Sequence, residues 1–331
     1  MYRTFNEMKQ PFYFFFIISS LFSIKSNAQR DTVKLNDRYY RHNYENDFFS
    51  STDRYYTQGV YLELIFPVFK KTLLAKTLIP LKSRSGKTIL NYYGMSLERQ
   101  GFTPRSIRHE GIYYGERPFA AVAYVTHSLV SINTENRVRL TTRINVGFIG
   151  PNLRGAQEQK GIHYKLKNIQ PLGWENQIEN DYVLNYDVFI EKGLVNKKHF
   201  EITGIGELRV GTLYDDIGIG SMIRVGWMQP YFSNLGLTRN KQARKFQCYI
   251  YAKGKIKAVG YNASMQGGMI NHNSVYTIPA SDIYRDVESV YFGMVIAYKR
   301  LSLEYSKVYI SPEFKGGLCH GWGRVGINVC F

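Results

Sequence analysis

The stretch Arg137-Val138-Arg139-Leu140-Thr141-Thr142-Arg143-Ile144-Asn145-Val146-Gly147-Phe148 alternates apolar and polar residues with a period of two. Successive side chains of a β-strand point to opposite faces, so this segment predicts a strand with one apolar and one charged face. A transmembrane β-barrel would turn the apolar face to lipid and the charged face to its lumen. The expected lipid-facing set is Val138, Leu140, Ile144, Val146 and Phe148, and the expected lumenal set is Arg137, Arg139 and Arg143.

The same alternation recurs at 60–66, 290–296 and 301–305. A soluble β-sandwich also alternates, but it would have shorter loops, and the 27 Tyr and 20 Phe suit the aromatic girdles of a membrane barrel. We predict an all-β fold, a transmembrane antiparallel β-barrel of about 12 strands with a short helical extracellular loop that carries active-site residues. The predicted strands are 38–48, 57–68, 88–101, 119–132, 136–149, 180–192, 199–213, 217–229, 245–259, 287–299, 300–310 and 321–331.

Turns and loops of different length are expected at opposite ends of the barrel. The short turns 133–136 and 196–198 should face the periplasm. The longer stretches are predicted to be extracellular loops; these are 69–87, 102–118, 150–179 and 260–286.

The N-terminus has the pattern of a secretory signal peptide, residues 1–28. Arg3 and Lys9 precede an apolar block, and Ser26 and Ala28 supply small residues at a cleavage site. A membrane anchor is the alternative, but the block is shorter than the roughly 20 residues of a spanning helix. The remaining chain, 29–331, is expected to be one outer-membrane barrel domain.

The last segment, 324–331, alternates up to the terminal Phe331. This ending resembles the signal read by barrel-assembly machinery during biogenesis, although an ordinary strand ending on Phe would look the same. Together with the signal peptide and the other alternating segments, it favours the barrel.

The chain is strongly basic, with 43 Lys and Arg against 26 Asp and Glu and a net charge of +17. The charges are scattered along strand-like segments and no nucleic-acid-binding motif occurs, so a phosphorylated lipid such as lipopolysaccharide is the more natural anionic partner. Cys248, Cys319 and Cys330 show no metal-ligand spacing and predict no disulfide.

The stretch from Gly150 to His163 interrupts the barrel pattern. If it is helical from about Pro151, Gln159 and His163 share one face, and an imidazole can accept a proton from water near neutral pH. A lone histidine is more often structural. Gly161 costs about 1 kcal/mol relative to Ala, which predicts a helix that is short or broken there.

A second cluster, Glu45-Asn46-Asp47, ends the first predicted strand. Carboxylate and amide oxygens are the hard ligands that Ca²⁺ prefers, so Asn46 and Asp47 are candidate metal ligands, although acidic pairs at strand ends are usually only solvated. From the sequence alone, Thr57 marks the transition from a turn to a strand.

Four stretches together resemble the outer-membrane lipid A 3'-O-deacylase family over nearly the whole mature chain; they are 44–49, 52–59, 150–163 and 173–177. The resemblance implies that His163 is the catalytic base and that Gln159, Asn46, Asp47 and Thr57 are active-site residues. It also implies a Ca²⁺ cofactor that polarises the ester carbonyl of lipid A.

The stretch Tyr114-Gly115-Glu116-Arg117-Pro118-Phe119-Ala120 resembles a family motif, Asp-Arg-Pro-Tyr-Ala-Gly, with departures at Glu116, Phe119 and Ala121. Arg117 could bind a substrate phosphate through bidentate hydrogen bonds or pair with a carboxylate inside the barrel. The stretch 311–316 resembles the family's last loop.

Signatures of other hydrolases are missing from the sequence, including Gly-x-Ser-x-Gly and His-Glu-x-x-His. We therefore expect an outer-membrane carboxylic ester hydrolase that removes the 3'-linked acyl chain of lipid A through His-activated water, with its active site on the extracellular side. The alternatives are a glycerophospholipid hydrolase on the same barrel and a non-catalytic channel or receptor.

Overall fold

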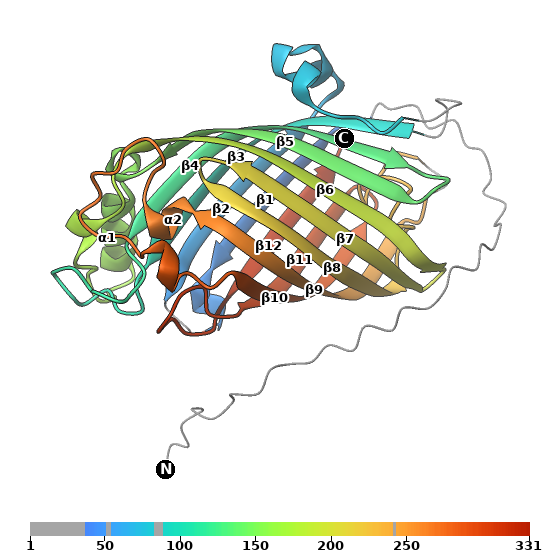
Figure 1. Ribbon diagram of the computed structural model, residues 1–331. Helices are drawn as coiled ribbons and strands as arrows, with labels where there is room; N and C mark the ends of the chain where they lie inside the picture. The colour runs from blue at the N-terminus through green and yellow to red at the C-terminus, as the bar shows by residue number, and fades with distance from the viewer. Residues whose placement is uncertain (1–36, 51–53, 83–88, 241–242) are drawn as a thin grey trace. The chain divides into compact units, whose positions relative to one another are not determined.

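The computed structural model describes residues 37–331 apart from 51–53, 83–88 and 241–242, so the predicted signal peptide lies outside the described residues. Within these residues, strands β1 to β12 form one closed antiparallel barrel in which each strand pairs with its neighbours in sequence (Figure 1). The predicted fold class is confirmed, and every predicted strand overlaps an observed one.

The strands are β1 (Tyr39–Asn46), β2 (Tyr55–Ile65), β3 (Ile89–Thr103), β4 (Ala120–Asn133), β5 (Val138–Ile149), β6 (Asp181–Lys197), β7 (Phe200–Gly211), β8 (Tyr214–Trp227), β9 (Phe246–Asn262), β10 (Asp286–Tyr298), β11 (Leu301–Ile310) and β12 (His320–Cys330). The helical segments are η1 (Asp47–Ser50), η2 (Pro67–Lys71), η3 (Leu73–Thr77), η4 (Pro151–Leu153), α1 (Gly155–Lys165), η5 (Trp174–Asn176), α2 (Ala263–Gln266) and η6 (Ala280–Asp282). Across the described ranges, every helix is too short or too polar to span a bilayer.

The two ends of the chain close the barrel. Tyr39 of β1 pairs with Cys330 of β12. Beyond them, Arg38 N donates to the Phe331 carbonyl at 3.1 Å, and Phe331 N donates to the Arg38 carbonyl at 2.9 Å. The terminal aromatic residue thus extends the closing ladder, which leaves no free edge at this seam.

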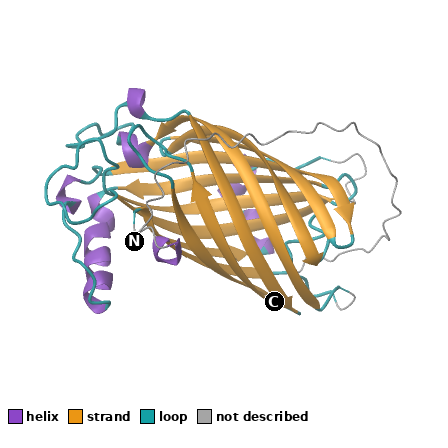
Figure 2. Ribbon diagram, turned by 90° about the horizontal axis from the view of Figure 1, so that it is seen from below, coloured by secondary structure: helices purple, strands orange, loops and turns teal. Residues whose placement is uncertain are grey.

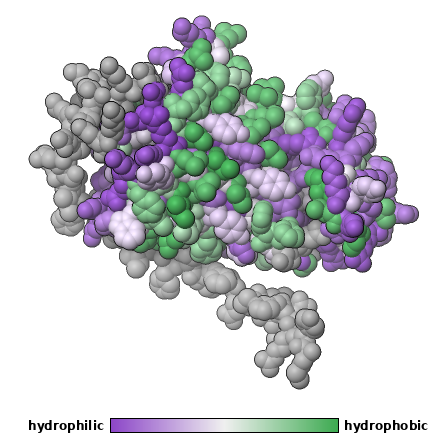
Figure 3. Space-filling view, turned by 180° about the vertical axis from the view of Figure 1, so that it is seen from behind, coloured by the Kyte–Doolittle hydropathy of each residue, from purple (hydrophilic) through white to green (hydrophobic). Residues whose placement is uncertain are grey.

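Strand β5 separates lipid-facing from lumen-facing residues as predicted. Val146 and Phe148 are 49% and 52% exposed on the outside. On the inside, an Arg139 amino group donates to the Tyr231 carbonyl at 2.6 Å, and Arg143 lines a cavity of about 370 Å³. Figure 3 shows hydrophobic residues over the middle of one face and hydrophilic residues toward its ends, the distribution of a membrane-spanning wall.

Charged residues of the lumen neutralise one another. The ion pairs within it include Arg41–Glu63, Arg224–Glu201, Arg209–Asp216 and Lys255–Glu207. Many of the Arg and Lys side chains therefore lie inside the barrel, where charges are tolerated, and not on the lipid-facing wall.

The connections fall into two groups. Segments 47–50, 104–119, 150–180, 263–285 and 311–319 lie at one end, here named the loop end, and the paired residues Arg38 and Phe331 lie at the other, here named the terminus end. The prediction that 69–87 lies on the same side as 102–118 was wrong. Successive connections of an up-and-down barrel alternate between its ends, so the described part of the connection from β2 to β3, residues 66–82, lies at the terminus end with the short turns.

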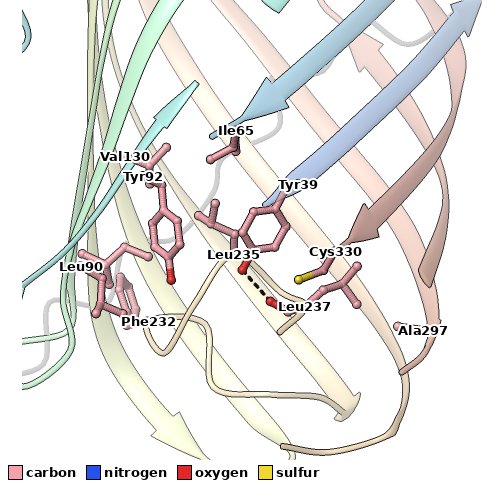
Figure 4. Close-up of a cluster of buried hydrophobic side chains, with 11 residues drawn as sticks. Tyr39, Ile65, Leu90, Tyr92, Val130, Phe232, Leu235, Leu237, Ala297 and Cys330 are labelled. Carbon is pink, nitrogen blue, oxygen red and sulfur yellow. Dashed lines mark hydrogen bonds between the residues drawn. The ribbon is translucent and has the colours of Figure 1, made fainter. Parts of the chain in front are cut away.

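A plug segment, residues 228–239, folds into the barrel at the terminus end. Its Phe232, Leu235 and Leu237 are buried against Tyr39 and Tyr92 of the wall (Figure 4). The Tyr39 hydroxyl donates to the Leu237 carbonyl at 2.7 Å. The plug segment thus occupies part of the lumen at that end.

Candidate functional site

Helix α1 lies at the loop end of the barrel, after the short helix η4 (Figure 2). Pro151 begins η4, a position where its missing N–H is not needed, and Arg154 adopts a φ of 56° between the two helices. Helix α1 is short, as predicted, but it continues through Gly161 without a break. Gln159 and His163 lie on its buried face, 4% and 7% exposed.

Two small residues let α1 approach the outer wall. Ala121 has the outward orientation of Val125, which lies on the same face of β4 and is 46% exposed. A Cβ added to Gly155 would lie 2.8 Å from the Ala121 Cβ and 2.9 Å from Cη2 of Trp174. Glycine is therefore required at 155 by close packing of the helix against the wall.

An arginine on the wall fastens α1 in place. Arg99 of β3 donates from Nε to Oε2 of Glu158 at 2.6 Å and from Nη2 to the Leu153 carbonyl at 2.7 Å. The pair is partly exposed, so its contribution to stability is modest, but two donors from one planar group fix the orientation of the helix.

A β-bulge in β2 directs Thr57 toward α1. The register between β2 and β3 shifts between Tyr56 and Gln58, which makes Thr57 the extra residue. Tyr56 lines the lumenal cavity, whereas the Thr57 hydroxyl accepts a long hydrogen bond, 3.4 Å, from Nε2 of Gln159 on the outer side. The bulge thus brings a hydroxyl from the barrel wall to the helix.

Trp174 sets the orientation of the Gln159 amide. Its Nε1 donates to Oε1 of Gln159 at 2.7 Å, and its ring packs against Phe119 with centroids 4.8 Å apart. An indole N–H only donates, so the amide oxygen must face Trp174 and the amide nitrogen must face Thr57. A gap of about 10 Å³ lies between these three side chains, close to the smallest space that holds one water.

The ring of His163 is held by the loop that follows α1. Its Nδ1 lies 2.5 Å from the Ile169 carbonyl oxygen, and the backbone N–H of Asn168 donates to the His163 carbonyl at 2.8 Å. A carbonyl only accepts, so Nδ1 carries the proton and Nε2 of the neutral ring carries the lone pair. His163 can therefore accept a proton at Nε2.

Asn46 and Asp47 lie at the loop end of β1, the strand that pairs with β2, which carries Thr57. Asn46 pairs in register with Gln58. Its Oδ1 accepts the Phe48 N–H at 2.8 Å, which caps η1, and Asp47 begins η1 and is 3% exposed. The structure thus joins Gln159 to Thr57 directly, with His163 one helical turn away and Asn46 next to Gln58 on the neighbouring strand.

Asn46 and Asp47 match Ca²⁺ in the kind of ligand that they offer. Ca²⁺ takes roughly six to eight oxygen ligands, and a carboxylate and an amide carbonyl are both suitable. Among the described residues, no three His, Cys, Asp or Glu side chains gather in a metal-binding arrangement. A calcium shell built on these two residues would draw its other ligands from backbone, amide, hydroxyl or water oxygens.

Arg117 belongs to a different, buried network. Its Nη1 donates to Oε2 of Glu313 and its Nη2 to the Ser264 hydroxyl, both at 2.6 Å. The guanidinium lies 4.3 Å from the Phe102 ring centroid and is 2% exposed. Of the two roles that the sequence left open, the geometry favours an internal ion pair, which ties the motif at 114–120 to the last loop.

Glu116, a departure from the family motif, is also buried. Burial raises the pKa of its carboxyl. The Tyr55 hydroxyl donates to its Oε1 at 3.1 Å and the Arg105 backbone N–H to its Oε2 at 3.2 Å. These contacts connect the segment 104–119 to the start of β2.

Sequence reasoning missed the residues that hold the site together. Trp174 lies in the stretch 173–177, which resembles the family, but the sequence assigned it no role. Glu158 precedes Gln159 and was not identified as a site residue either. Arg99 is one charged residue among many in an alternating strand, so no local signal distinguished it. Its role depends on α1 folding back over β3.

The comparisons with known proteins agree with this architecture. The model of a family described as outer membrane protein LpxR matches residues 14–331. Among solved structures, LpxR from Salmonella typhimurium aligns with a TM-score of 0.70 at 19% identity, covering 88% of this chain and 100% of that chain. The β domain of the Bordetella autotransporter Brka aligns with a TM-score of 0.42 at 8% identity, covering 88% and 97%.

No curated protein matches the sequence. The family model nevertheless spans nearly the whole chain, and the Salmonella structure has the same barrel fold. The protein is therefore an outer-membrane barrel that belongs to the outer membrane protein LpxR family, the lipid A 3'-O-deacylases.

Proposed function

We propose that this protein is an outer-membrane esterase that hydrolyses the 3'-linked acyl chain of lipid A. The observation that carries the proposal is the arrangement on α1: His163 is held through Nδ1 with Nε2 as its proton acceptor, and Gln159 is fixed between Trp174 and Thr57. These groups lie against the outer, lipid-facing side of the barrel wall and not in the lumen.

In the proposed reaction, water attacks the ester carbonyl directly. His163 accepts the water proton at Nε2 while the water oxygen bonds to the acyl carbon. The bond between that carbon and the sugar oxygen then breaks, His163 returns the proton to the sugar oxygen to form a hydroxyl, and the acyl chain departs as a free acid. Gln159 and Thr57 orient water and ester through their amide and hydroxyl groups. The sequence offers no serine-nucleophile motif, which supports a mechanism without a covalent acyl-enzyme.

Asp47 and Asn46 are the proposed calcium ligands. Ca²⁺ bound there would supply positive charge to stabilise the oxyanion of the tetrahedral intermediate. Asn46 pairs in register with Gln58, the residue after Thr57.

The exposed side of α1 suits an anionic lipid. Tyr164 near the end of α1 and Leu166 just after it are 80% and 71% exposed, and the exposed Lys160, Lys165 and Lys167 lie in the same stretch of sequence. Apolar side chains can contact acyl chains while lysines attract phosphate. In the proposed orientation the loop end faces outside, where lipid A lies, and the barrel-assembly machinery inserts the chain from the periplasm.

The contents of the lumen argue against the alternative of a channel. The plug segment packs buried apolar residues into the terminus end, and ion pairs between neighbouring strands line the interior. A glycerophospholipid hydrolase would use the same catalytic groups and remains the second candidate, because the site chemistry is that of a general ester hydrolase.

Mass spectrometry of lipids from cells with and without this protein tests the proposal. Loss of one acyl chain from lipid A at the 3' position is the expected result. Accumulation of lysophospholipid with intact lipid A would support the second candidate instead, and unchanged lipids from cells that contain the assembled barrel would count against both.

A further inference from the structure

Residues 66–82, here named the strap, lie outside the barrel at the terminus end (Figure 1, cyan). The strap follows β2 and contains η2 and η3. Instead of extending into solvent, it folds back over the outer surface of β4, β5 and β6. Its Thr77 carbonyl accepts a hydrogen bond from the Tyr186 hydroxyl of β6 at 2.8 Å.

Three polar side chains of the outer wall are buried beneath the strap. His127 and Ser131 of β4 are 2% and 0% exposed, and Thr142 of β5 is 0% exposed. They have the outward orientation of Val125 and Val146, which stay exposed where no strap covers them. An uncovered wall would present these polar groups to hydrocarbon, where unsatisfied hydrogen-bonding groups are costly.

The strap supplies a partner to each of the three. His127 Nε2 lies 2.6 Å from the Thr72 hydroxyl. The Ser131 hydroxyl accepts the Leu81 N–H at 3.0 Å, and the Thr142 hydroxyl accepts the Ile79 N–H at 3.1 Å. These matched contacts make the strap an integral layer of the wall.

The opposite side of the strap is apolar and basic. Leu73, Val68 and Ile79 are 78%, 59% and 53% exposed. The strap contains no Asp or Glu, and all four of its lysines are exposed; they are Lys70, Lys71, Lys76 and Lys82. Exposed aliphatic side chains beside lysines are the pattern of a segment that lies in a membrane interface, with apolar groups among acyl chains and ammonium groups at the headgroups.

We propose that the strap is an interfacial anchor that binds anionic glycerophospholipid headgroups in the leaflet at the terminus end. The lysines attract the negative charge, and the exposed leucine, valine and isoleucine side chains insert at the level of the headgroups. In the orientation proposed above this is the periplasmic leaflet. The anchoring itself needs no catalytic activity, so it stands or falls separately from the deacylase proposal.

Fluorescence quenching of the full chain in vesicles tests the anchor. Leu73→Cys is introduced after Cys248 and Cys319 are replaced by Ser, and the new thiol carries a polarity-sensitive fluorophore. The protein is reconstituted in phosphatidylcholine containing phosphatidylglycerol. Quenchers are iodide in water and a headgroup spin label on either lipid. The matched control is Val275→Cys, which is 62% exposed in the segment 263–285 at the loop end.

The label at 73 should be quenched by spin-labelled lipid and be several-fold less accessible to iodide than the label at 275. Spin-labelled phosphatidylglycerol should quench it at least twofold more than spin-labelled phosphatidylcholine. The triple variant Lys70→Gln, Lys71→Gln, Lys76→Gln should remove that preference. Lys197→Gln with Lys198→Gln, which lies around a short turn at the same end, should keep it.

Equal iodide quenching at both positions would place the strap in water and overturn the proposal. Equal quenching by the two spin-labelled lipids in the chain with all its lysines would overturn the anionic preference, and so would its loss in the Lys197 and Lys198 variant. The comparison of the two lipids needs no lysine substitution, so the test holds even if the triple variant assembles poorly.

Discussion

Trp174 donates its indole N–H to the Gln159 amide oxygen at 2.7 Å and so determines that the amide nitrogen faces Thr57. One residue lies in a loop after α1 and the other in the middle of the helix, and the barrel wall supplies the third. The motifs at 150–163 and 173–177 are therefore parts of a single arrangement, in which the loop orients a side chain of the helix toward a strand.

Trp174→Phe should reduce kcat about tenfold with little change in KM. Phenylalanine keeps a ring to pack against Phe119 but removes the donor, which leaves the buried Gln159 oxygen without this partner and the amide free to rotate. Steady-state deacylation of purified lipid A measures the effect. Trp227→Phe, on a lipid-facing position that is 60% exposed, is the control and should retain full activity. An unchanged kcat in Trp174→Phe would show that the amide needs no such orientation.

His163→Asn should lower deacylation by 100-fold or more, because a general base contributes roughly 10²–10⁴ to the rate. The barrel should still assemble, since closure of its strands does not involve α1. Heat-modifiable gel mobility checks assembly, and lipid A mass spectrometry checks activity. His199→Asn, at an exposed turn of the terminus end, should behave as the parent chain. Wild-type deacylation by an assembled His163→Asn variant would exclude His163 as the base.

Gly155→Ala should impair activity, whereas Gly161→Ala should not. An added methyl at 155 would clash with Ala121 and Trp174 and push α1 away from Thr57, at a cost of about 1–3 kcal/mol. No atom lies within 4 Å of a methyl at 161, so that change should stabilise the helix by about 1 kcal/mol. Both variants are assayed for turnover and for thermal stability. Equal activity of the two would mean that the close approach of α1 is dispensable.

The barrel could be predicted from the sequence, because the alternation of apolar and polar residues along a strand is a local property. Val146 and Phe148 face outward and Arg139 and Arg143 inward, as a period of two requires. The wrong position of 69–87 arose from judging loops by length alone. Length reports neither the end at which a connection lies nor whether it folds back over the wall, as the strap does.

The candidate site was only partly predictable, because only some of its features are local in sequence. The spacing of Gln159 and His163 places them on one face of any helix. The outward direction of Thr57 depends instead on a β-bulge. The orientation of the Gln159 amide depends on the hydrogen bond from Trp174 and on the contact of Arg99 with Glu158, which holds α1 against the wall. Such features arise from contacts between distant segments, which a single sequence does not display.

Chelation of calcium should abolish turnover, and added Ca²⁺ should restore it. The proposed ligands, Asp47 and Asn46, are hard oxygen donors, so Zn²⁺ should restore little. Asp47→Asn should raise the Ca²⁺ concentration needed for half-maximal activity by tenfold or more, whereas Asp282→Asn, at an exposed ion pair, should leave it unchanged. Full turnover in excess EDTA that does not respond to added calcium would contradict a metal-assisted mechanism.

Glu313→Gln should destabilise the loop end by about 3–5 kcal/mol, because it leaves the buried Arg117 guanidinium without its carboxylate. Asp282→Asn breaks the exposed pair with Lys315 nearby and should cost less than about 1 kcal/mol. Thermal unfolding measures both variants. If Arg117 instead bound a lipid phosphate, Glu313→Gln would leave stability unchanged and lower the KM for lipid A.

The same pair predicts a pH dependence of stability. Burial raises the pKa of the Glu313 carboxyl, but Arg117 and then His320 lower it by more, so that pKa lies below its ordinary value. A carboxyl with a lowered folded-state pKa stabilises the fold fully above the pKa of free glutamate, and this stabilisation disappears as the pH falls through the lowered value. The difference in unfolding temperature between the parent chain and Glu313→Gln should therefore be largest near neutral pH and shrink in acid. A difference that stays constant across that range would show that the charge of Glu313 does not contribute to stability through Arg117.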